Sequence, residues 1–440
     1  MSTKRIIIII GVILLVTLGV WAYQASKNNG GTSSGSQSSG GIGSLFPFFG
    51  GNSGTSSTTT DSGNTDGGLG GGTTETPTGS SPLKRISNKV VGGYTIITPL
   101  DTTSPVTAIR KLIGSIAPTT PSTANTPVTV SAPKIRFMER GTGYIYDTDA
   151  LGVGEKKLTG TAIVRALDGL FADNGASVVI RYIKNDNQTV ATFLGHVPTQ
   201  EDDTVLGELK GDFLPDNVLD VVVAPDGKSI AYLLPSADGS VGLSMKTDGT
   251  SKKQLFVSPF SEWLLDWNGG GMMATTKASA QVAGYVYSIQ KSGYFQKILG
   301  NVSGLTTKAS PDGKNLLYSV TTNSKLGLYV FHTKDGSGVS LGLSTLPEKC
   351  VWAADNTTAY CAVDESAPTG NLPDSWYQGV THFSDSLWKI DTTSGTTTKM
   401  VDGGGMDAIK LSVDPTGKYL LFINKNDGGL WSLDLKPTEQ

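Results

Sequence analysis

The sequence predicts an all-β fold, a seven-bladed β-propeller, and three observations carry that prediction. A hairpin unit recurs along the chain, as VVVAPDGKSIAYLL at 221–234, KASPDGKNLLYSV at 308–320 and LSVDPTGKYLLFI at 411–423. Pro225 and Pro311 are 86 residues apart, which is two steps of 43. Each hairpin is followed by a third strand and often a fourth. Periods of 40–45 residues with four strands each are typical of propeller blades.

The repeated turn has the chemistry of a tight hairpin. Proline presets φ at the second turn position, aspartate tolerates the third, and glycine takes the left-handed position. The turns centred on Asp226, Asp312 and Thr416 fit this pattern, which favours a type I turn with a bulge.

Counting strands along the chain yields seven blades within residues 83–437. The last blade lacks a fourth strand, because the chain ends soon after its third. We expect residues 83–87 to complete that blade from the N-terminal side, with 90–97 as the innermost strand of blade one. Such closure removes the exposed edges of an open array. The remaining strands of the first two blades are expected at 134–140, 143–147, 156–159, 176–184 and 188–194.

The N-terminus predicts a membrane anchor. Residues 6–23 are 18 uncharged, mostly apolar residues, close to the length that spans a bilayer. Lys4 and Arg5 precede them and Lys27 follows, so residues 1–5 are expected in the cytoplasm and the propeller outside it. A cleaved signal peptide is one alternative, although the exit carries bulky Tyr23 where cleavage prefers a small residue. A buried core helix is the other.

Two segments are expected to lie outside regular blades. Residues 24–82 are rich in Gly, Ser and Thr, a composition that predicts a flexible linker with an r.m.s. span of about 40 Å. Residues 42–49 of this linker are mostly apolar and are called the apolar island. They are either a peptide that docks onto a partner or a linker segment with no assigned role. Residues 98–133 form an insertion with a short predicted helix, capped by Ser104. In an alternative assignment, 128–130 supplies the inner strand of blade one.

Cys350 and Cys361 flank the turn at Asp355 and Asn356 symmetrically. If that hairpin keeps register, the two side chains face each other on adjacent antiparallel strands, close enough for a disulfide. The predicted oxidising compartment favours the bond. Two packed free thiols and a functional redox pair are the alternatives.

The Pro-Asp-Gly-Lys hairpins, each followed by an aromatic third strand, resemble the TolB-like propeller repeat over about residues 84–437. The stretches IRFMERGTGYIYDTD at 135–149 and LPDSWYQGVTHFSDSLWKID at 372–391 also resemble uncharacterised membrane-anchored propeller proteins of candidate-phylum bacteria. The resemblance implies the fold and no particular activity, since these repeats accompany many functions.

The longest loop is the best candidate for a binding surface. Residues 364–386 form an insertion between the second and third strands of blade six, and the resemblance implies that such loops emerge on the ligand-binding face. Exposed aromatic side chains beside polar groups are typical of recognition surfaces. The candidate residues are Asp374, Trp376, Tyr377, Gln378, His382, Phe383 and Asp385. In the alternative, Trp376 and Phe383 fold back and pack the loop onto the blade.

The sequence predicts a non-enzymatic module, because it contains no recognisable catalytic constellation. The net charge of −3 and pI of about 5.7 argue against a nucleic-acid partner, and no metal or cofactor site is expected. We expect a single-pass protein of the cytoplasmic membrane that binds or scaffolds an envelope protein, peptide or glycan outside the cell; nothing in the sequence indicates an oligomeric state. One alternative is a propeller glycosidase or lyase, which would need two convergent carboxylates in the central cavity; Asp220, Asp266 and Asp414 lie on or beside inner strands, but nothing in the sequence pairs them. The other is a structural subunit that makes contact through 45–49.

Overall fold

The computed structural model describes residues 82–98, 132–199 and 205–436. The predicted membrane span, nearly all of the linker and the predicted helix of the 98–133 insertion lie outside these residues. Within the described ranges, no helix combines the length and hydropathy that a membrane crossing needs.

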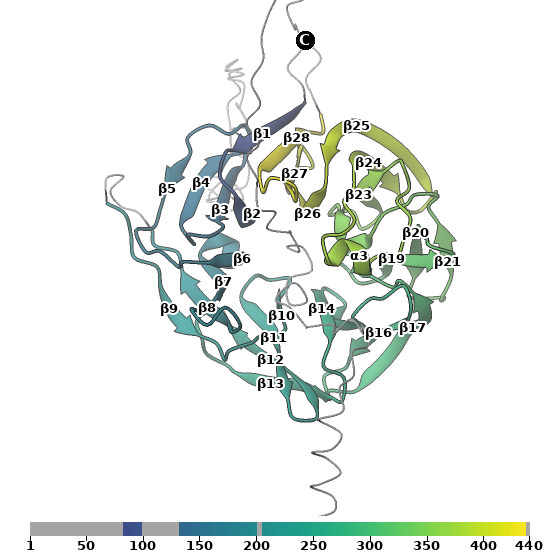
Figure 1. The fold of residues 1–440 in the computed structure, drawn as a ribbon, viewed down its shortest axis with the longest axis horizontal. Coiled ribbons are helices and arrows are strands. Elements are labelled where there is room, and N and C mark those ends of the chain that lie inside the picture. Colours follow the sequence, from purple (N-terminus) through teal and green to yellow (C-terminus); the bar gives the residue numbers. More distant parts are fainter. Residues whose placement is uncertain (1–81, 99–131, 200–204, 437–440) are drawn as a thin grey trace, which may run out of the picture. The chain divides into compact units, whose positions relative to one another are not determined.

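Seven four-stranded antiparallel sheets form a ring (Figure 1), which confirms the predicted seven-bladed propeller. Each blade runs outward from an innermost strand. The strands of blade one are β2 (Val91–Ile97), β3 (Lys134–Glu139), β4 (Ile145–Asp149) and β5 (Lys156–Lys157), and those of blade two are β6 (Ala166–Ala172), β7 (Ser177–Ile183), β8 (Val190–His196) and β9 (Lys210–Phe213). Blade three holds β10 (Asp220–Val223), β11 (Ser229–Ser236), β12 (Gly239–Lys246) and β13 (Lys253–Ser258), and blade four holds β14 (Trp263–Asn268), β15 (Gly271–Thr276), β16 (Ala283–Ile289) and β17 (Phe295–Ser303). Blades five and six contain β18 (Thr307–Ala309), β19 (Asn315–Thr322), β20 (Lys325–His332), β21 (Gly338–Ser340), β22 (Cys350–Trp352), β23 (Thr358–Asp364), β24 (Asp385–Asp391) and β25 (Thr396–Met406).

Blade seven is completed by the N-terminal strand, as predicted. Its strand order is β1 (Leu83–Ser87), β28 (Leu430–Asp434), β27 (Tyr419–Asn424) and β26 (Ala408–Val413). Leu83 pairs with Leu433 in an antiparallel ladder. The next blade is joined through Tyr94, whose hydroxyl donates to the carbonyl of Lys410 at 2.7 Å. The two ends of the propeller chain therefore close the ring together.

The recurring turns adopt the geometry that their residues predict. Gly227, Gly313 and Gly417 have φ of 71°, 72° and 64°, the left-handed region that only glycine enters without strain. A second glycine requirement comes from the packing of blades one and two. A Cβ on Gly93 would lie 1.7 Å from the carbonyl oxygen of Gly169, so these inner strands approach each other only because Gly93 carries no side chain.

Blade two departs from the repeat, and its inner and outer strands are not evident from the sequence. β6 and β7 are joined by the 3-10 turn η2 (Asp173–Gly175), in which Asn174 has φ of 51°. No Pro-x-Gly-Lys signal occurs there. Gly175 keeps the place of the turn glycine, with φ of 82°, but Asp173 and Ala176 stand where the repeat has proline and lysine, so the periodic signal disappears although the blade remains.

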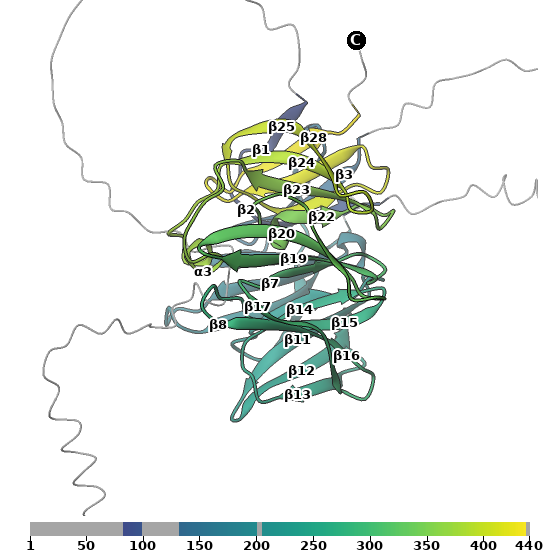
Figure 2. The ribbon, with the colours of Figure 1, turned by 90° about the vertical axis from the view of Figure 1, so that its right-hand side faces the viewer.

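Successive strands run in opposite directions between the two faces of the ring, so the connections between strands lie alternately on one face and on the other. We name the turn face after the Pro-x-Gly-Lys turns and the insertion face after the β23–β24 connection. Both ends of the propeller lie at the turn face, since the amide of Asp434 donates to Pro82 and that of Leu435 donates to Lys418 in the β26–β27 turn. In the edge-on view of Figure 2, helix α3 (Asp374–Tyr377), which belongs to the β23–β24 connection, lies on the opposite side.

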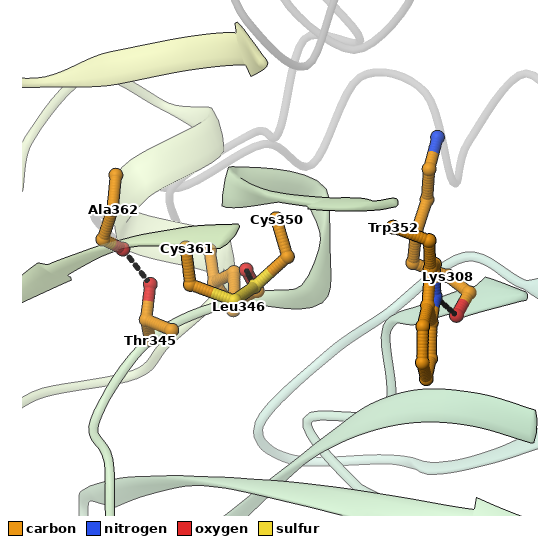
Figure 3. The surroundings of a disulfide bond; sticks show 7 residues. All are labelled: Lys308, Thr345, Leu346, Cys350, Trp352, Cys361 and Ala362. Atoms are coloured by element: carbon orange, nitrogen blue, oxygen red, sulfur yellow. Dashed lines mark hydrogen bonds between the residues drawn. A yellow bond between two sulfur atoms is a disulfide. The ribbon is translucent and has the colours of Figure 1, made fainter. Parts of the chain in front are cut away.

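Cys350 and Cys361 are directly paired residues of β22 and β23. Their Sγ atoms are bonded (Figure 3), and both side chains are buried beside Trp352. The indole of Trp352 donates to the carbonyl of Lys308 in blade five at 3.0 Å. The bond thus lies where blade six packs against blade five.

We expect the double variant C350A/C361A to lose about 3 kcal/mol of unfolding free energy. A disulfide across an 11-residue separation removes conformational entropy from the unfolded chain on that scale. Chemical denaturation of the oxidised wild type and the variant measures the difference. Mass spectrometry after iodoacetamide treatment of the denatured, unreduced wild type checks the premise, because alkylation of both cysteines would show that the bond is absent.

Candidate functional site

The β23–β24 insertion folds onto the propeller. Trp376 is fully buried and Phe383 is 2% exposed, and both belong to an apolar cluster that includes Leu346, Leu372 and Ile409. The expectation that these aromatic side chains are exposed is therefore wrong, as it is for Tyr377, which is also buried. The alternative, in which Trp376 and Phe383 pack the loop onto the blade, describes the structure. The gain from burying two large aromatic rings outweighs the freedom of the loop.

A buried ion cluster fixes the insertion in place. We call Lys349, Asp385, Asp407 and Trp376 the Lys349 cluster. Lys349 ends the 3-10 turn η3 (Pro347–Lys349) and has no exposed surface; its Nζ lies 2.8 Å from Asp385 and also contacts Asp407. The indole of Trp376 donates to Asp407 at 3.0 Å. Burial alone lowers the pKa of Lys349, but the two carboxylates outweigh it and raise that pKa, which keeps the cation charged.

Of the other predicted residues of the insertion, two form contacts within the propeller and two are exposed to solvent. Asp374 accepts the amide of Ala280 in blade four at 2.7 Å, so it ties the insertion to a neighbouring connection. Asp385 belongs to the Lys349 cluster, and burial raises its pKa to about 6. Gln378 and His382 are exposed. The insertion thus brings Trp376, Tyr377, Phe383 and Asp385 together as a packed unit and leaves only two of the seven predicted residues in solvent.

A cavity of about 580 Å³ lies on the axis of the ring, and we call it the axial cavity. All seven innermost strands contribute to its wall. Ser261, Glu262 and Lys277 come from connections on the insertion face, and Tyr377 comes from the insertion itself. Figure 1 shows α3 at the inner edge of blade six, beside the centre of the ring. The insertion therefore supplies part of a central pocket rather than a free recognition loop.

Glu348 is the most unusual group in this wall. The hydroxyl of Tyr377 donates to its Oε1, whereas Oε2 is buried and has no hydrogen-bond partner among the described residues. No lysine or arginine of the described part of the chain forms an ion pair with it. Burial raises its pKa to about 7. The sequence offered no motif around Glu348; its environment arises only when η3, α3 and the inner strands meet.

The remaining charges of the axial cavity are largely satisfied. Asp168 contacts Lys410 and lies 3.4 Å from Arg181; burial raises its pKa, but the two cations outweigh it, so the pKa is lowered overall. Asp220 accepts the amide of Leu265 at 2.7 Å and has a pKa raised by burial to about 6.

Asp266, a second carboxylate on an inner strand, also bridges two blades. It accepts the amide of Ala309 at 3.1 Å, across one repeat. Asp220 and Asp266 thus line the axial cavity while joining neighbouring inner strands. Asp414 does not: it caps the β26–β27 turn by accepting the amide of Tyr419. Within the described ranges, no group of three or more His, Cys, Asp or Glu side chains is arranged to hold a metal ion.

Replacing Glu348 by glutamine is expected to flatten the pH dependence of stability. A carboxyl whose pKa rises from 4.5 to about 7 on folding contributes stability that is present below pH 4.5 and lost as the pH rises through 7. The full change corresponds to about 3 kcal/mol. We therefore expect E348Q to be more stable than the wild type at pH 8, by about 1–3 kcal/mol, in urea unfolding measured from pH 4.5 to 8.

Glu365→Gln serves as the control. Glu365 forms an exposed ion pair with Lys399, which lowers its pKa out of this range, so the profile between pH 5 and 8 should match the wild type. A parallel profile for E348Q would show that Glu348 titrates as it does in the unfolded chain.

Comparison with known proteins matches the chain to no family. No protein-family model matches the chain, and no curated protein matches it. Similar solved structures include TolB from Acinetobacter baumannii, at 13% identity and a TM-score of 0.39, with 60% of each chain covered. An oligogalacturonate lyase in complex with manganese has 10% identity and a TM-score of 0.45, over 69% of this chain and 86% of the other. The propeller domain of the Trilobed protease from Pyrococcus furiosus has 11% identity and a TM-score of 0.44, over 69% and 90% of the two chains.

The aligned part spans less than two thirds of the TolB chain.

Proposed function

We propose that this protein is a membrane-anchored, extracytoplasmic binding module that holds part of an envelope protein, peptide or glycan in its axial cavity. The observation that carries the proposal is the cavity itself, which has the size of a typical small-ligand site and a wall of mixed apolar and charged side chains. Rigid blades position the wall, and the packed insertion completes it. The ligand site is thus assigned to the axis rather than to an exposed aromatic loop.

The chemistry of the wall suits an organic ligand with polar groups. Trp267 and Tyr94 offer partly exposed rings, and Lys308 presents an exposed side chain. The unpartnered oxygen of Glu348 marks a place where the protein alone leaves a polar group unsatisfied. Aromatic faces together with a few directed polar groups are the usual composition of a specific small-ligand pocket.

The chain topology supports an orientation for this site. The tether enters β1 at the turn face, and the wall of the axial cavity includes connections of the insertion face. With a linker that makes no other contact with the propeller, an anchor at residues 6–23 would therefore attach to the side of the ring that lies away from the insertion. A tether of the predicted length would then restrict the propeller to the membrane vicinity and raise its effective concentration toward envelope partners.

Site-specific photocrosslinking in intact cells tests the proposal. A benzophenone amino acid at Lys308, on the cavity wall, is compared with one at Asp226, which is exposed on the turn face. We expect adducts at position 308 only, and mass spectrometry of the adduct identifies peptide or glycan. Equal yields at both positions would count against the axial cavity as the site.

An enzyme is the second candidate, and one observation favours it. Asp220 and Glu348 line the same cavity with pKa values of about 6 and 7, and raised carboxyl pKa values suit general acid catalysis in glycoside cleavage. Incubation with envelope polysaccharide and measurement of new reducing ends tests it. Turnover lost in both D220N and E348Q would establish the enzyme, whereas adduct formation without turnover supports the binding module.

A further inference from the structure

A second cavity, of about 730 Å³, lies outside the ring axis, and we call it the blade-two groove. Its walls are the 161–165 connection between β5 and β6, the 182–186 turn between β7 and β8, and Phe193, Leu209 and Phe213. None of these residues lines the axial cavity. The groove is therefore a separate feature that the proposed function does not use.

The groove exposes large apolar side chains. Val164 is 68% exposed and Phe213 is 66% exposed. The ring of Phe213 packs against that of Phe193 at 5.1 Å between centroids, so the groove has an aromatic wall. Apolar side chains gathered around a concave site mark a place where another apolar segment binds.

The charged side chains of the groove are already engaged. The guanidinium of Arg165 donates to the carbonyl of Lys184 at 3.0 Å and to Asn187 at 2.8 Å. The ammonium of Lys184 lies 2.7 Å from Asp216. Asp186, the carboxylate of the lining, accepts the amides of Gln188 and Thr189 at 2.9 Å. Because all three charged side chains have partners within the propeller, the chemistry left for recognition is mainly apolar. The groove suits an uncharged, aromatic occupant better than a charged one.

The chain itself contains such an occupant. Residues 42–49, Ile-Gly-Ser-Leu-Phe-Pro-Phe-Phe, carry five large apolar side chains and no charge, in a linker otherwise nearly free of them. The 33 residues at 50–82 connect this island to β1, with an extended reach of up to about 110 Å and an r.m.s. span of about 30 Å. Only blade one separates blade seven, which contains β1, from blade two. A linker of this kind gives the island an effective concentration in the millimolar range.

We propose that the blade-two groove binds residues 42–49 of the same chain. Burial of Phe46, Phe48 and Phe49 against Phe193 and Phe213 would form the aromatic contacts that such rings favour. In a chain anchored through residues 6–23, docking leaves only residues 24–41 as free tether. The r.m.s. length of the free tether then falls to about 25 Å. The β5–β6 and β7–β8 connections that form the groove lie on the insertion face, so docking moves the exit of the tether from the turn face to the insertion face and sets how far the axial cavity stands from the bilayer.

The test compares full-length proteins in phosphatidylcholine nanodiscs. Hydrogen exchange of residues 161–165 and 182–186 and oxidative labelling of Phe213 report occupancy of the groove. We expect the groove to be protected in the wild type and at least tenfold more reactive in F46S/F48S/F49S. Leu69→Ser, which removes an apolar linker residue outside the island, should match the wild type. These substitutions lie outside the propeller, so they leave its folding unaffected.

A peptide of residues 42–50 provides the second measurement. Added to the triple variant, it should restore protection, and Phe213→Asp should weaken its binding about tenfold or more, as expected for loss of a buried aromatic contact. Equal reactivity of the wild type and F46S/F48S/F49S would overturn the proposal. So would protection that disappears on dilution, because that result assigns the groove to a second copy. Protection lost in I109S/L112S/I113S but kept in F46S/F48S/F49S would assign it to the 98–133 insertion and also overturn the proposal.

Discussion

Replacing Lys349 by methionine is expected to destabilise the protein by about 3–5 kcal/mol. The substitution leaves Asp385 and Asp407 facing each other in a site with no exposed side-chain surface, and removing one partner of a buried ion pair has a cost of this size. Trp376 and the insertion depend on the same carboxylates. Urea unfolding at pH 7.5, followed by tryptophan fluorescence, measures the loss.

The pH dependence of K349M gives an independent check. Burial already raises the pKa of Asp385 to about 6, and loss of the cation raises it further. A raised carboxyl pKa adds stability below the unfolded value and loses it as the pH rises through the folded value. The deficit should therefore be smaller at pH 5 than at pH 8.

Lys399→Met is the matched control for K349M. Lys399 pairs with Glu365 and Asp402 at the surface, where an ion pair contributes about 0–1 kcal/mol. Similar losses in K399M and K349M would mean that the Lys349 cluster does not hold the insertion. A K349M protein that unfolds like the wild type would lead to the same conclusion.

Deleting residues 1–88 is expected to destabilise the propeller by on the order of 3 kcal/mol and to make it associate. The deletion removes β1, including Ile86, which is 3% exposed, and burial of one such side chain contributes about 1.5–3 kcal/mol. It also leaves the backbone groups of β28 without partners, and an unpaired edge strand templates association with other chains. Thermal unfolding and size-exclusion chromatography measure the two effects.

Deletion of residues 1–81 is the paired control, because it removes everything upstream and keeps β1. We expect it to elute as a monomer and to lose no more unfolding free energy than the proposed contact of residues 42–49 contributes, about 1.4 kcal/mol for tenfold protection. If the two deletions behave alike, β1 makes no contribution to ring closure. In that case, any loss of stability that the two deletions share comes from residues before 82.

Local chemistry in the sequence was enough to predict the ring. The Pro-x-Gly-Lys turns recur because the tight hairpin between the two inner strands of a blade needs a residue that enters positive φ, as Gly227 and Gly313 do and as Asn356 does in blade six. Cys350 and Cys361 are equally far in sequence from the turn that joins their strands, so an antiparallel hairpin in regular register places them opposite each other. The missing fourth strand of blade seven pointed to 83–87 because a propeller leaves no edge of this kind unpaired. Blade two lacked its signal because Asp173 and Ala176 stand in place of the proline and the lysine of the turn, although Gly175 keeps the glycine.

The candidate site was not predictable in the same way. Trp376 and Phe383 read as exposed because they stand in a long polar insertion; they are buried because that insertion packs across the Lys349 cluster. The sequence does not distinguish Asp220, Asp266 and Asp414, because each lies on or beside an inner strand. Only Asp220 and Asp266 line the axial cavity. Glu348 belonged to no motif at all.

Strand number, turn type, blade count and the strand that closes the ring were set by periodicities within a few dozen residues, so the sequence determined them by itself. Which carboxylate lacks a partner, which aromatic ring is buried and where the cavities lie depend on residues tens to hundreds of positions apart. Tyr94 and Lys410, at opposite ends of the propeller chain, meet at 2.7 Å. Only the closed ring decides such contacts, because burial and electrostatic environment are properties of the packed molecule and not of any local segment.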